Sequence, residues 1–422
     1  MTTQTIPKGW TITTLGEVAE NIAYGYTESS SQEKVGPKFL RITDIQDDFI
    51  SWDSVPYCPI SKEDHDKYRL EIGDVVIART GNSTGATATI KDDIDAVFAS
   101  YLIRFKIDKK RADFRFIDFL LRSEMWKGFV KSVKGGSAQG GANARNFAEF
   151  PVLLPHTAEQ KAIAAVLSAL DDKIELLRKQ NKTLESIAQT LFKRWFVDFE
   201  FPNEKGKPYK SSGGKIVGST LGKIPAGWKW GCLADVATQC GKSVSPDELS
   251  PDTPYIGLEH MPRRSIAIDN WEGAGKVTSG KLAFQRGDYL FGKLRPYFHK
   301  VGIAPIDGIC STDIVVLRAK RPIASAFVIC CISQNEFVAY TDKSSGGTKM
   351  PRTSWEQMGR FELSLPPDGL LKTFQDCTAP MLARIVANIH ETRTLTALRD
   401  SLLPKLMKGE LRVKGFNGKK YV

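Results

Sequence analysis

Three things are scarce in this 422-residue sequence: paired cysteines, long apolar runs and intact catalytic motifs. The seven cysteines are odd in number and none forms a C-x-x-C pair, which argues against a disulfide framework and a zinc ribbon. The opening MTTQTIPKGW has no basic segment followed by an apolar run, and no apolar stretch approaches the roughly 20 residues of a membrane span. We therefore expect a cytoplasmic protein that is neither secreted nor membrane-embedded.

Signatures of catalysis are present only in broken form. The DTPY at residues 252–255 resembles the N-P-P-Y motif of DNA methyltransferases but has Thr where that motif has Pro. The GKS at residues 241–243 lacks the partner glycine of a P-loop, because Val236 occupies that position. The five histidines are scattered singly, and neither H-E-x-x-H nor G-x-S-x-G occurs. The sequence thus predicts no catalytic residue, no metal and no directly bound cofactor.

What the chain does have is positive charge and enough apolar residues for real cores. Lys and Arg number 59 against 48 Asp and Glu, for a net charge of +11, which favours a polyanionic partner through counterion release. Hydrophobic residues make up 41% of the chain, which is ordinary for a folded protein. Its length exceeds the roughly 250 to 300 residues at which one core stops growing, so at least two domains are expected.

The main organising feature is an internal repeat. PKGW at residues 7–10 recurs as PAGW at 225–228, and the Gly-Asp pair at 73–74 recurs at 287–288. A Gly-Gly pair precedes Ser137 in the first copy, and another precedes Thr348 in the second. These motifs recur in the same order roughly 215 residues apart. An internal repeat of this kind predicts a fold with two similar halves.

Each copy begins as a compact domain with short strands and short helices. Runs of β-type residues broken by Gly, Pro, Asn and Asp predict strands at 38–42, 74–79, 96–107, 254–258, 288–291 and 312–317. Apolar residues at helical spacing predict helices at 114–133 and 325–341. The expected fold class is α+β, with two pseudo-repeated mixed α/β domains.

A long helix is predicted after each compact domain. Between residues 158 and 197 a seam close to the 3.5-residue period of a coiled coil runs through Leu167, Leu170, Ile174, Leu177, Asn181, Leu184, Ala188, Leu191 and Trp195. A less regular seam follows in the second copy, through Leu382, Ile385, Ile389, Leu395, Leu398 and Leu402. Neither helix can bury its stripe alone, so we expect the two to pack together, and Asn181 to set their register.

These patterns divide the chain into six segments. They are a first domain at 1–155, a first helical spacer at 156–200, a flexible linker rich in Gly, Lys, Ser and Pro at 201–222, a second domain at 223–367, a second spacer at 368–410 and a basic tail at 411–422.

The ordered set of motifs resembles the specificity subunits of Type I restriction-modification systems over nearly the whole chain. It includes the two P-x-G-W openings, the Gly-Asp strands, EQKAIA at 159–164, LFKRWFVDF at 191–199 and LLPKLMKGEL at 402–411. The second helix lacks the Glu-Gln-x-x-Ile opening of the first, so its subunit contacts are less defined. The resemblance implies two target-recognition domains separated by two long antiparallel helices.

The resemblance also implies partners. A protein of this kind binds double-stranded DNA and two modification subunits, which use S-adenosylmethionine. Through them it binds restriction subunits, which use ATP and Mg. It has no catalytic centre of its own and no membrane partner. It would read a bipartite, asymmetric DNA target and direct methylation and restriction.

Loop chemistry selects the residues expected to contact DNA, because glycines permit close approach to phosphates and the polar side chains suit base edges. In the first domain they are Arg79, Thr80, Asn82, Ser83, Thr84, Lys134, Ser137, Gln139, Asn143 and Arg145. In the second they are Lys293, Arg295, Tyr297, His299, Lys300, Lys343, Thr348, Lys349 and Arg352. The alternative is that these loops are solvated turns whose glycines serve backbone geometry alone.

Two further hypotheses remain open. One is a stand-alone DNA methyltransferase whose cofactor motifs are degenerate, which would transfer methyl groups unaided. The other is a structural coiled-coil adaptor, which would have no salt-dependent affinity for DNA.

Overall fold

The computed structural model describes residues 6–46, 49–50, 52–135, 142–219, 222–346 and 350–413. The chain forms two compact units. One comprises Met1–Asp172 with Thr396–Val422, and the other comprises Lys173–Leu395. Each long helix is thus shared between the two units rather than forming a separate segment, which differs from the six-segment division expected from the sequence.

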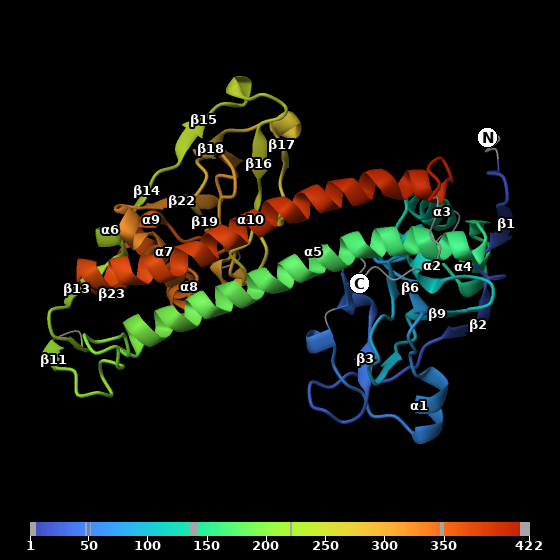
Figure 1. Cartoon of the computed structure of the whole chain (residues 1–422), viewed down its shortest axis with the longest axis horizontal. Helices are drawn as coiled ribbons and strands as arrows, with labels where there is room; N and C mark the ends of the chain where they lie inside the picture. The colour runs from blue at the N-terminus through green and yellow to red at the C-terminus, as the bar shows by residue number, and fades with distance from the viewer. Residues whose placement is uncertain are drawn as a thin grey trace. The chain divides into compact units, whose positions relative to one another are not determined.

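The first unit contains a four-stranded antiparallel sheet (Figure 1). Its order is β2 (Ala19–Tyr24), β9 (Leu102–Ile107), β6 (Asp74–Ala78) and β7 (Thr87–Thr89). Beside it, β1 (Thr11–Thr14) pairs with β10 (Pro151–Leu154), β3 (Lys38–Leu40) runs parallel to β8 (Ala96–Phe98), and β4 (Ile45–Gln46) pairs with β5 (Phe49–Ile50). The helices are α1 (Lys62–Tyr68), α2 (Phe114–Leu121), α3 (Glu124–Gly135) and α4 (Ala144–Ala148).

The second unit repeats the central sheet of the first and two of its strand pairs. Its four-stranded sheet has the order β14 (Ala237–Gln239), β22 (Ile314–Ala319), β19 (Tyr289–Gly292) and β20 (Val301–Ile303). The pair β13 (Lys229–Cys232) and β23 (Glu362–Leu365) answers to β1 and β10, and the parallel pair β16 (Pro254–Ile256) and β21 (Gly308–Cys310) answers to β3 and β8. The helices are α6 (Leu233–Val236), α7 (Ser325–Ile332), α8 (Asn335–Lys343) and α9 (Trp355–Gly359).

The second unit also has strands without a counterpart in the first. They are the hairpin β11 (Ile216–Ser219) and β12 (Gly222–Pro225), together with β15 (Lys242–Val244), β17 (Glu272–Gly273) and β18 (Lys281–Phe284). The repeat inferred from the sequence is therefore real at the level of strand order, and the two copies differ by added strands.

The repeated Gly-Asp motif lies where the chain turns into a strand of each four-stranded sheet. Gly73 and Gly287 have φ of 101° and 89°, the left-handed region that favours glycine, and they turn the chain into β6 and β19. The next residue in each case is a buried aspartate whose carboxylate accepts a backbone N–H from the turn: Glu71 N to Asp74 at 3.0 Å and Gln285 N to Asp288 at 2.7 Å. The Gly-Asp motif is thus structural, because it satisfies buried backbone groups.

The long helices are α5 (Thr157–Phe192), which continues into a π-helical turn at Lys193–Val197, and α10 (Asp368–Met407). In the second unit Asn388 Nδ2 donates to Asn181 Oδ1 at 2.8 Å, and Lys173 lies 3.1 Å from Glu391. In the first unit Arg399 lies 2.8 Å from Asp171. Residues later in α5 contact residues earlier in α10, so the two helices pack antiparallel within each unit. The predicted α+β fold with an antiparallel helix pair is confirmed.

Several boundaries differ from the prediction. The helix expected at 114–133 is divided into α2 and α3, and at the break Ser123 Oγ donates to Leu120 O at 2.6 Å. The helix expected at 325–341 is likewise divided into α7 and α8, and the strand expected at 96–107 is divided into β8 and β9 by a turn.

The segment at 201–222, expected to be a flexible linker, makes packing contacts in its described part. The Tyr209 ring stacks on the Phe201 ring with centroids 4.5 Å apart, Phe201 stacks on Trp228 at 5.4 Å, and the β11–β12 hairpin follows. Aromatic packing offsets the entropy of ordering this Gly-rich stretch. Most of the basic tail, from residue 414, lies outside the described residues.

Across the described ranges, no single helix is long and apolar enough to cross a membrane. The bent pair Pro322–Ile332 and Asn335–Lys343 meets the length and composition criteria together, but residues 326–332 of α7 are buried in the core of the second unit.

Candidate nucleic-acid interface

In the first unit, the structure brings together the loop that leaves β6 and the loop that precedes α4. Ala142 N donates to Arg79 O at 3.0 Å, and Lys134 Nζ donates to Asn82 O at 3.4 Å. The sequence separates these loops by about 60 residues, so their contact is a product of the fold. Of the predicted side chains here, Asn82 and Asn143 are exposed, and that of Arg145 is 90% exposed.

Arg79 lies at the contact between these two loops, and its guanidinium is held in place. Nε donates to Ser100 O at 3.0 Å, and the guanidinium carbon lies 5.2 Å from the centroid of the Tyr24 ring. Tyr24 in turn accepts the N–H of Ala144 at 3.0 Å through its hydroxyl. One face of the guanidinium is therefore covered by an aromatic ring, an arrangement that pre-orders a cation for a ligand.

Some predicted residues in these loops have local structural roles instead. Thr84 is buried, and its hydroxyl donates to Gly81 O at 2.8 Å, so we reassign it as a residue that shapes the loop. Asn143 caps α4 by accepting the N–H of Asn146 at 2.9 Å. Thr80 and Ser83 are partly buried, while Ser137 and Gln139 lie outside the described residues.

In the second unit, the corresponding loops meet in the same way. Thr353 N donates to Lys293 O at 3.0 Å, and Arg295 N donates to Pro351 O at 2.8 Å. Lys293 occupies the position in the repeat that Arg79 occupies in the first unit. The two halves thus share one construction, in which the loop after the Gly-Asp strand is hydrogen-bonded to the loop before a short helix.

Arg295 has an unusual conformation at the start of the short 3₁₀ turn Pro296–Phe298. Its φ is 51° and its ψ is 66°, and its Nε is buried without a hydrogen-bond partner among the described atoms. Left-handed conformation outside glycine costs energy and concentrates at functional sites. Tyr297, which follows, is 48% exposed, so the turn presents an aromatic ring to solvent.

Two predicted residues of this loop face inward, and we correct their assignment. His299 is buried, with its Nε2 3.0 Å from Ser333 O, and burial lowers the pKa of the imidazole below its ordinary value. Lys300 is partly buried and its ammonium donates to Leu258 O, and burial lowers its pKa as well. Both side chains hold the loop against neighbouring segments rather than extending to solvent.

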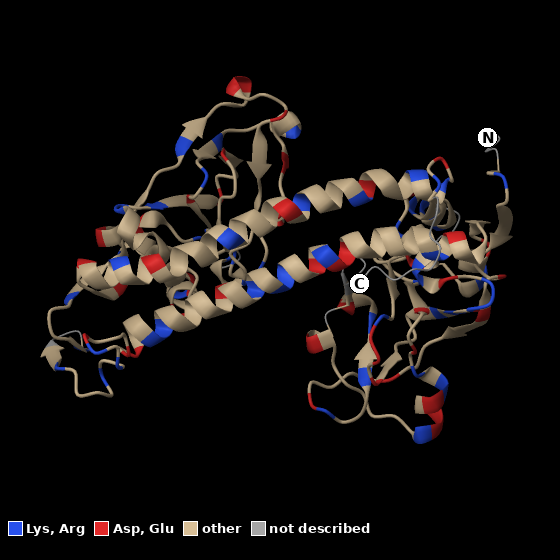
Figure 2. Ribbon diagram, in the orientation of Figure 1, with Lys and Arg blue, Asp and Glu red and all other residues tan. Residues whose placement is uncertain are grey.

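The remaining predicted residues of the second unit lie at the edge of this surface. Lys343 is exposed at the end of α8. Arg352 is exposed and its Nε donates to Asp313 Oδ1 at 3.1 Å, which fixes its direction. Thr348 and Lys349 lie outside the described residues. Basic and acidic residues are interspersed along both halves and both long helices (Figure 2), so the net positive charge is not confined to one segment.

Sequence reasoning missed four exposed residues beside these loops. Tyr24 and Tyr101 are 44% and 55% exposed, and Tyr101 O accepts the N–H of Arg79 at 3.0 Å. Arg263 and Arg264 are exposed on a loop that reaches the 293–300 segment, where Arg264 N donates to His299 O at 2.9 Å. The two adjacent arginines of the PRR motif at 262–264 can be read from the sequence, but the loop that they contact in the fold cannot.

One group in the described part of the chain has potential metal ligands close together: Glu259, His260 and Glu272, with ligand atoms within 4.8 Å of one another. The Nδ1 atom of His260 already accepts the N–H of Gly257 at 2.9 Å, which leaves a proton on Nε2 in the neutral ring. A metal would have to displace that proton, so the group is a poor cation site as it is arranged.

Comparison with known proteins agrees with this architecture. The sequence model of the Type I restriction modification DNA specificity domain matches residues 7–186. The chain is 26% identical to the Type I restriction enzyme MjaIX specificity subunit of Methanocaldococcus jannaschii, with 71% of this chain and 69% of that protein aligned. It is 21% identical to the Type I restriction enzyme HindI specificity subunit of Haemophilus influenzae, with 95% and 99% aligned.

A solved structure has the same fold. The crystal structure of the Type-I restriction-modification system S subunit from M. genitalium superposes with a TM-score of 0.57 at 15% identity, covering 94% of this chain and 96% of that one.

Proposed function

We propose that the chain is a Type I restriction-modification specificity subunit, the non-catalytic subunit that recognises a bipartite, asymmetric DNA sequence and directs methylation and restriction by partner subunits. Its similarity to the specificity domain and to two specificity subunits supports this. The observation that supports this most directly is the matching pair of loop contacts in the two units, Ala142 N to Arg79 O and Thr353 N to Lys293 O. Each unit thus carries one surface that reads DNA. The two surfaces are built on equivalent four-stranded sheets and present different side chains.

The difference between the readers accounts for asymmetry. An exact two-fold assembly of identical readers would favour a palindrome, whereas two unlike loop sets on equivalent frames read two unlike half-sites. The first surface offers Arg79 with its Tyr24 cover and the exposed Arg145, and the second offers Arg295, Tyr297 and Lys343. These are the donors and aromatic groups that read base edges and phosphates.

The partners follow from this role. We infer that two modification subunits, which hold S-adenosylmethionine, bind the chain, and that restriction subunits using ATP and Mg join through them. The chain itself supplies the loops and the helices that hold them. The alternative of a stand-alone methyltransferase predicts that the isolated chain transfers a labelled methyl group from S-adenosylmethionine to DNA, whereas our proposal predicts no transfer.

Domain exchange tests the proposal. Residues 1–155 are replaced by the matching half of a relative that reads another sequence, and methylated sites are mapped in cells carrying the intact system. We expect one half of the methylated sequence to change and the other to persist. If both halves change together, or if deleting the gene leaves every methylated site in place, the two-reader proposal is refuted.

A further inference from the structure

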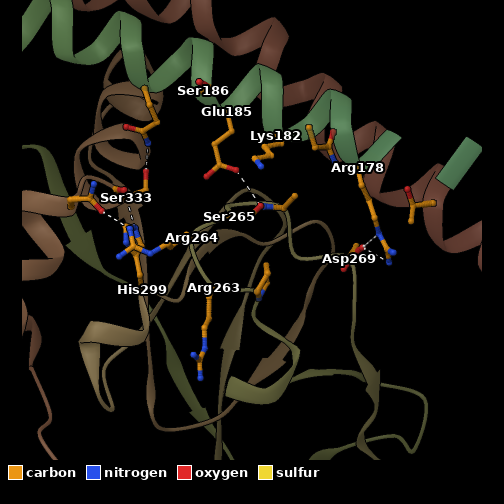
Figure 3. A pocket seen from close by; sticks show the side chains of 16 residues that line it. Arg178, Lys182, Glu185, Ser186, Arg263, Arg264, Ser265, Asp269, His299 and Ser333 are labelled. Atoms are coloured by element: carbon orange, nitrogen blue, oxygen red, sulfur yellow. Dashed lines mark hydrogen bonds and ion pairs between the residues drawn. The ribbon is translucent and has the colours of Figure 1, made fainter. Parts of the chain in front are cut away.

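A cavity of about 770 Å³ lies between the part of α5 in the second unit and the loop at residues 262–269 (Figure 3). Arg178, Lys182 and Glu185 extend from α5 toward that loop, which carries Arg263 and Arg264. Four cationic side chains and two carboxylates, Glu185 and Asp269, therefore line one space, and its net charge is positive.

Two of the four cations are already engaged. Arg178 lies 3.0 Å from Asp269, and Arg264 donates to Asn335 Oδ1 at 3.0 Å. Lys182 and Arg263 are exposed, and neither forms an ion pair with a carboxylate in the described part of the chain. These two side chains are consequently available to an anionic ligand from outside.

The cavity is continuous with the DNA-reading loop of the second unit. The guanidinium carbon of Arg263 lies 4.2 Å from the centroid of the Phe298 ring, and Arg264 N donates to His299 O at 2.9 Å. Arg264, Arg295 and His299 all have φ between 51° and 56°. Three non-glycine residues in left-handed conformation therefore place backbone strain in these two loops.

Glu185 fixes the distance between helix and loop. Its carboxylate accepts the hydroxyl of Ser265 at 3.1 Å and the N–H of Ile266 at 3.0 Å. The loop that carries Arg263 is thereby hydrogen-bonded to the helix that carries Lys182. Both cations line the cavity, and the Arg263 side chain extends away from α5 (Figure 3).

We propose that this cavity binds the phosphodiester backbone of DNA beside the half-site read by the second unit, through Lys182 and Arg263. The spacer helix α5 then contacts DNA directly and adds affinity that is independent of base sequence. This inference rests on the proposed DNA-binding function and assigns a phosphate contact to an element that the sequence marked only as a spacer.

The test compares two double variants of the full-length chain that change the charge equally. Lys182→Gln with Arg263→Gln removes the proposed contacts. Lys179→Gln with Lys320→Gln removes two exposed cations, one on the same helix and one in the same unit, that do not line the cavity. Binding to a duplex containing the mapped target and to a scrambled duplex is measured across a series of salt concentrations.

For the cavity variant we expect affinity for both duplexes to fall by a similar factor. The plot of log K against log salt should become shallower by about 1.8, because each lost phosphate contact accounts for about 0.9. The control variant should keep the wild-type slope. If Arg263→Lys is used in the cavity variant in place of Arg263→Gln, the charge is kept and part of the lost slope should be restored. Equal slopes in cavity and control variants would overturn the inference while leaving DNA recognition intact.

A free phosphate compound is the competing occupant. The inference is refuted if three results are found together: ATP or inorganic phosphate binds the wild-type chain, the cavity variant does not bind it, and the DNA salt slope is the same in both. The cavity would then bind a free phosphate compound. If the wild-type chain in its complex binds no DNA at any salt concentration, the proposed function fails first, and that outcome is distinct.

Discussion

The arginines of the first reading surface differ in how firmly they are held. Arg79 is held by Ser100 and Tyr24, whereas the side chain of Arg145 is 90% exposed and only 3.7 Å from Glu149. A fixed guanidinium keeps its geometry without DNA, and a free one loses side-chain entropy when it binds. Arg145 is the cleaner test, since its removal leaves no buried group unpaired.

We expect Arg145→Ala to weaken binding to the target duplex by roughly 1 to 3 kcal/mol and to relax discrimination at one base pair. Competition with duplexes substituted at each position measures both effects, and Lys62→Ala on α1 serves as the exposed control. A loss that is uniform across all sequences, with a shallower salt slope, would identify Arg145 as a phosphate contact instead.

Glu185 makes the stability of the second unit depend on pH. Burial raises the pKa of its carboxyl to about 7, although the hydrogen bonds from Ile266 and Ser265 oppose the shift. A carboxyl whose folded pKa exceeds its unfolded value binds protons more tightly in the native state. Its contribution to stability is therefore fully present at low pH and is lost as pH rises toward about 7.

Glu185→Gln should accordingly stabilise the protein at pH 8 by roughly 1 to 3 kcal/mol, because an uncharged amide avoids the cost of burying a charge. Near pH 4.5, where the native carboxyl is protonated, the advantage should vanish. Urea unfolding followed at both pH values measures the difference. An equal effect of the substitution at the two pH values would mean that Glu185 is not the titrating group.

At the scale of the helices, the most informative contact is the buried amide pair. Asn181 and Asn388 are 5% and 0% exposed, and their side chains are joined by a 2.8 Å hydrogen bond. A polar pair inside an apolar seam is satisfied only when the two residues lie opposite each other, so it selects one register at a cost in stability.

Replacing one member should cost more than replacing both. Asn181→Leu leaves the buried Asn388 amide with only the 3.4 Å hydrogen bond to Gln180 Oε1, and we expect a loss of about 1 to 3 kcal/mol. The double variant with Leu at both positions should recover that loss, and the coupling energy follows from a double-mutant cycle in urea. Additive effects of the two single substitutions would show that the pair does not determine the packing.

The helices also show what the sequence could and could not predict. In α5 the predicted seam is correct: Leu167, Ile174, Leu177 and Ala188 are buried, because a regular apolar period reports a buried face. In α10 the predicted Leu398 is 46% exposed. The buried face there passes through polar residues, namely Thr378, Asn388 and Thr392, and a hydrophobic pattern cannot register positions that bury polar groups.

The reading surfaces were predictable in part for a related reason. Glycine and basic residues marked the correct loops, but the burial of Thr84 and His299 depends on contacts with Gly81 and Ser333 that tertiary structure alone creates. The cover of Arg79 by Tyr24 joins residues on different strands, and no local pattern encodes it.

At the scale of the whole chain, each helix ends against the opening motif of a domain. In the first unit Arg412, just after α10, donates to Glu159 Oε2 at 2.8 Å and to Lys8 O at 3.1 Å, and Trp10 donates to Glu159 at 3.2 Å. In the second unit Phe196, at the end of α5, packs on Trp228 with centroids 6.0 Å apart. The two P-x-G-W motifs therefore serve the same purpose, which is to anchor a helix end.

We propose that the length of this helix pair sets the number of unread base pairs between the half-sites, and a matched insertion tests it. The two units divide between Asp172 and Lys173 in α5 and between Leu395 and Thr396 in α10. One heptad added at each of these points lengthens both helices by about 10 Å and keeps the apolar seam nearly in phase, since the drift is only about 20° per heptad.

A lengthening of about 10 Å corresponds to roughly three base pairs at 3.4 Å each, so the gap in methylated sites should grow by up to three. Three base pairs also turn the DNA by about 100°, given 10 to 10.5 per turn, and the helices supply little of that rotation. We therefore expect a longer gap together with weaker binding, because the DNA must untwist to present both half-sites. Methylome mapping of cells carrying the insertion measures the gap. An active complex whose gap is unchanged would show that partner subunits set the spacing and that the helices do not.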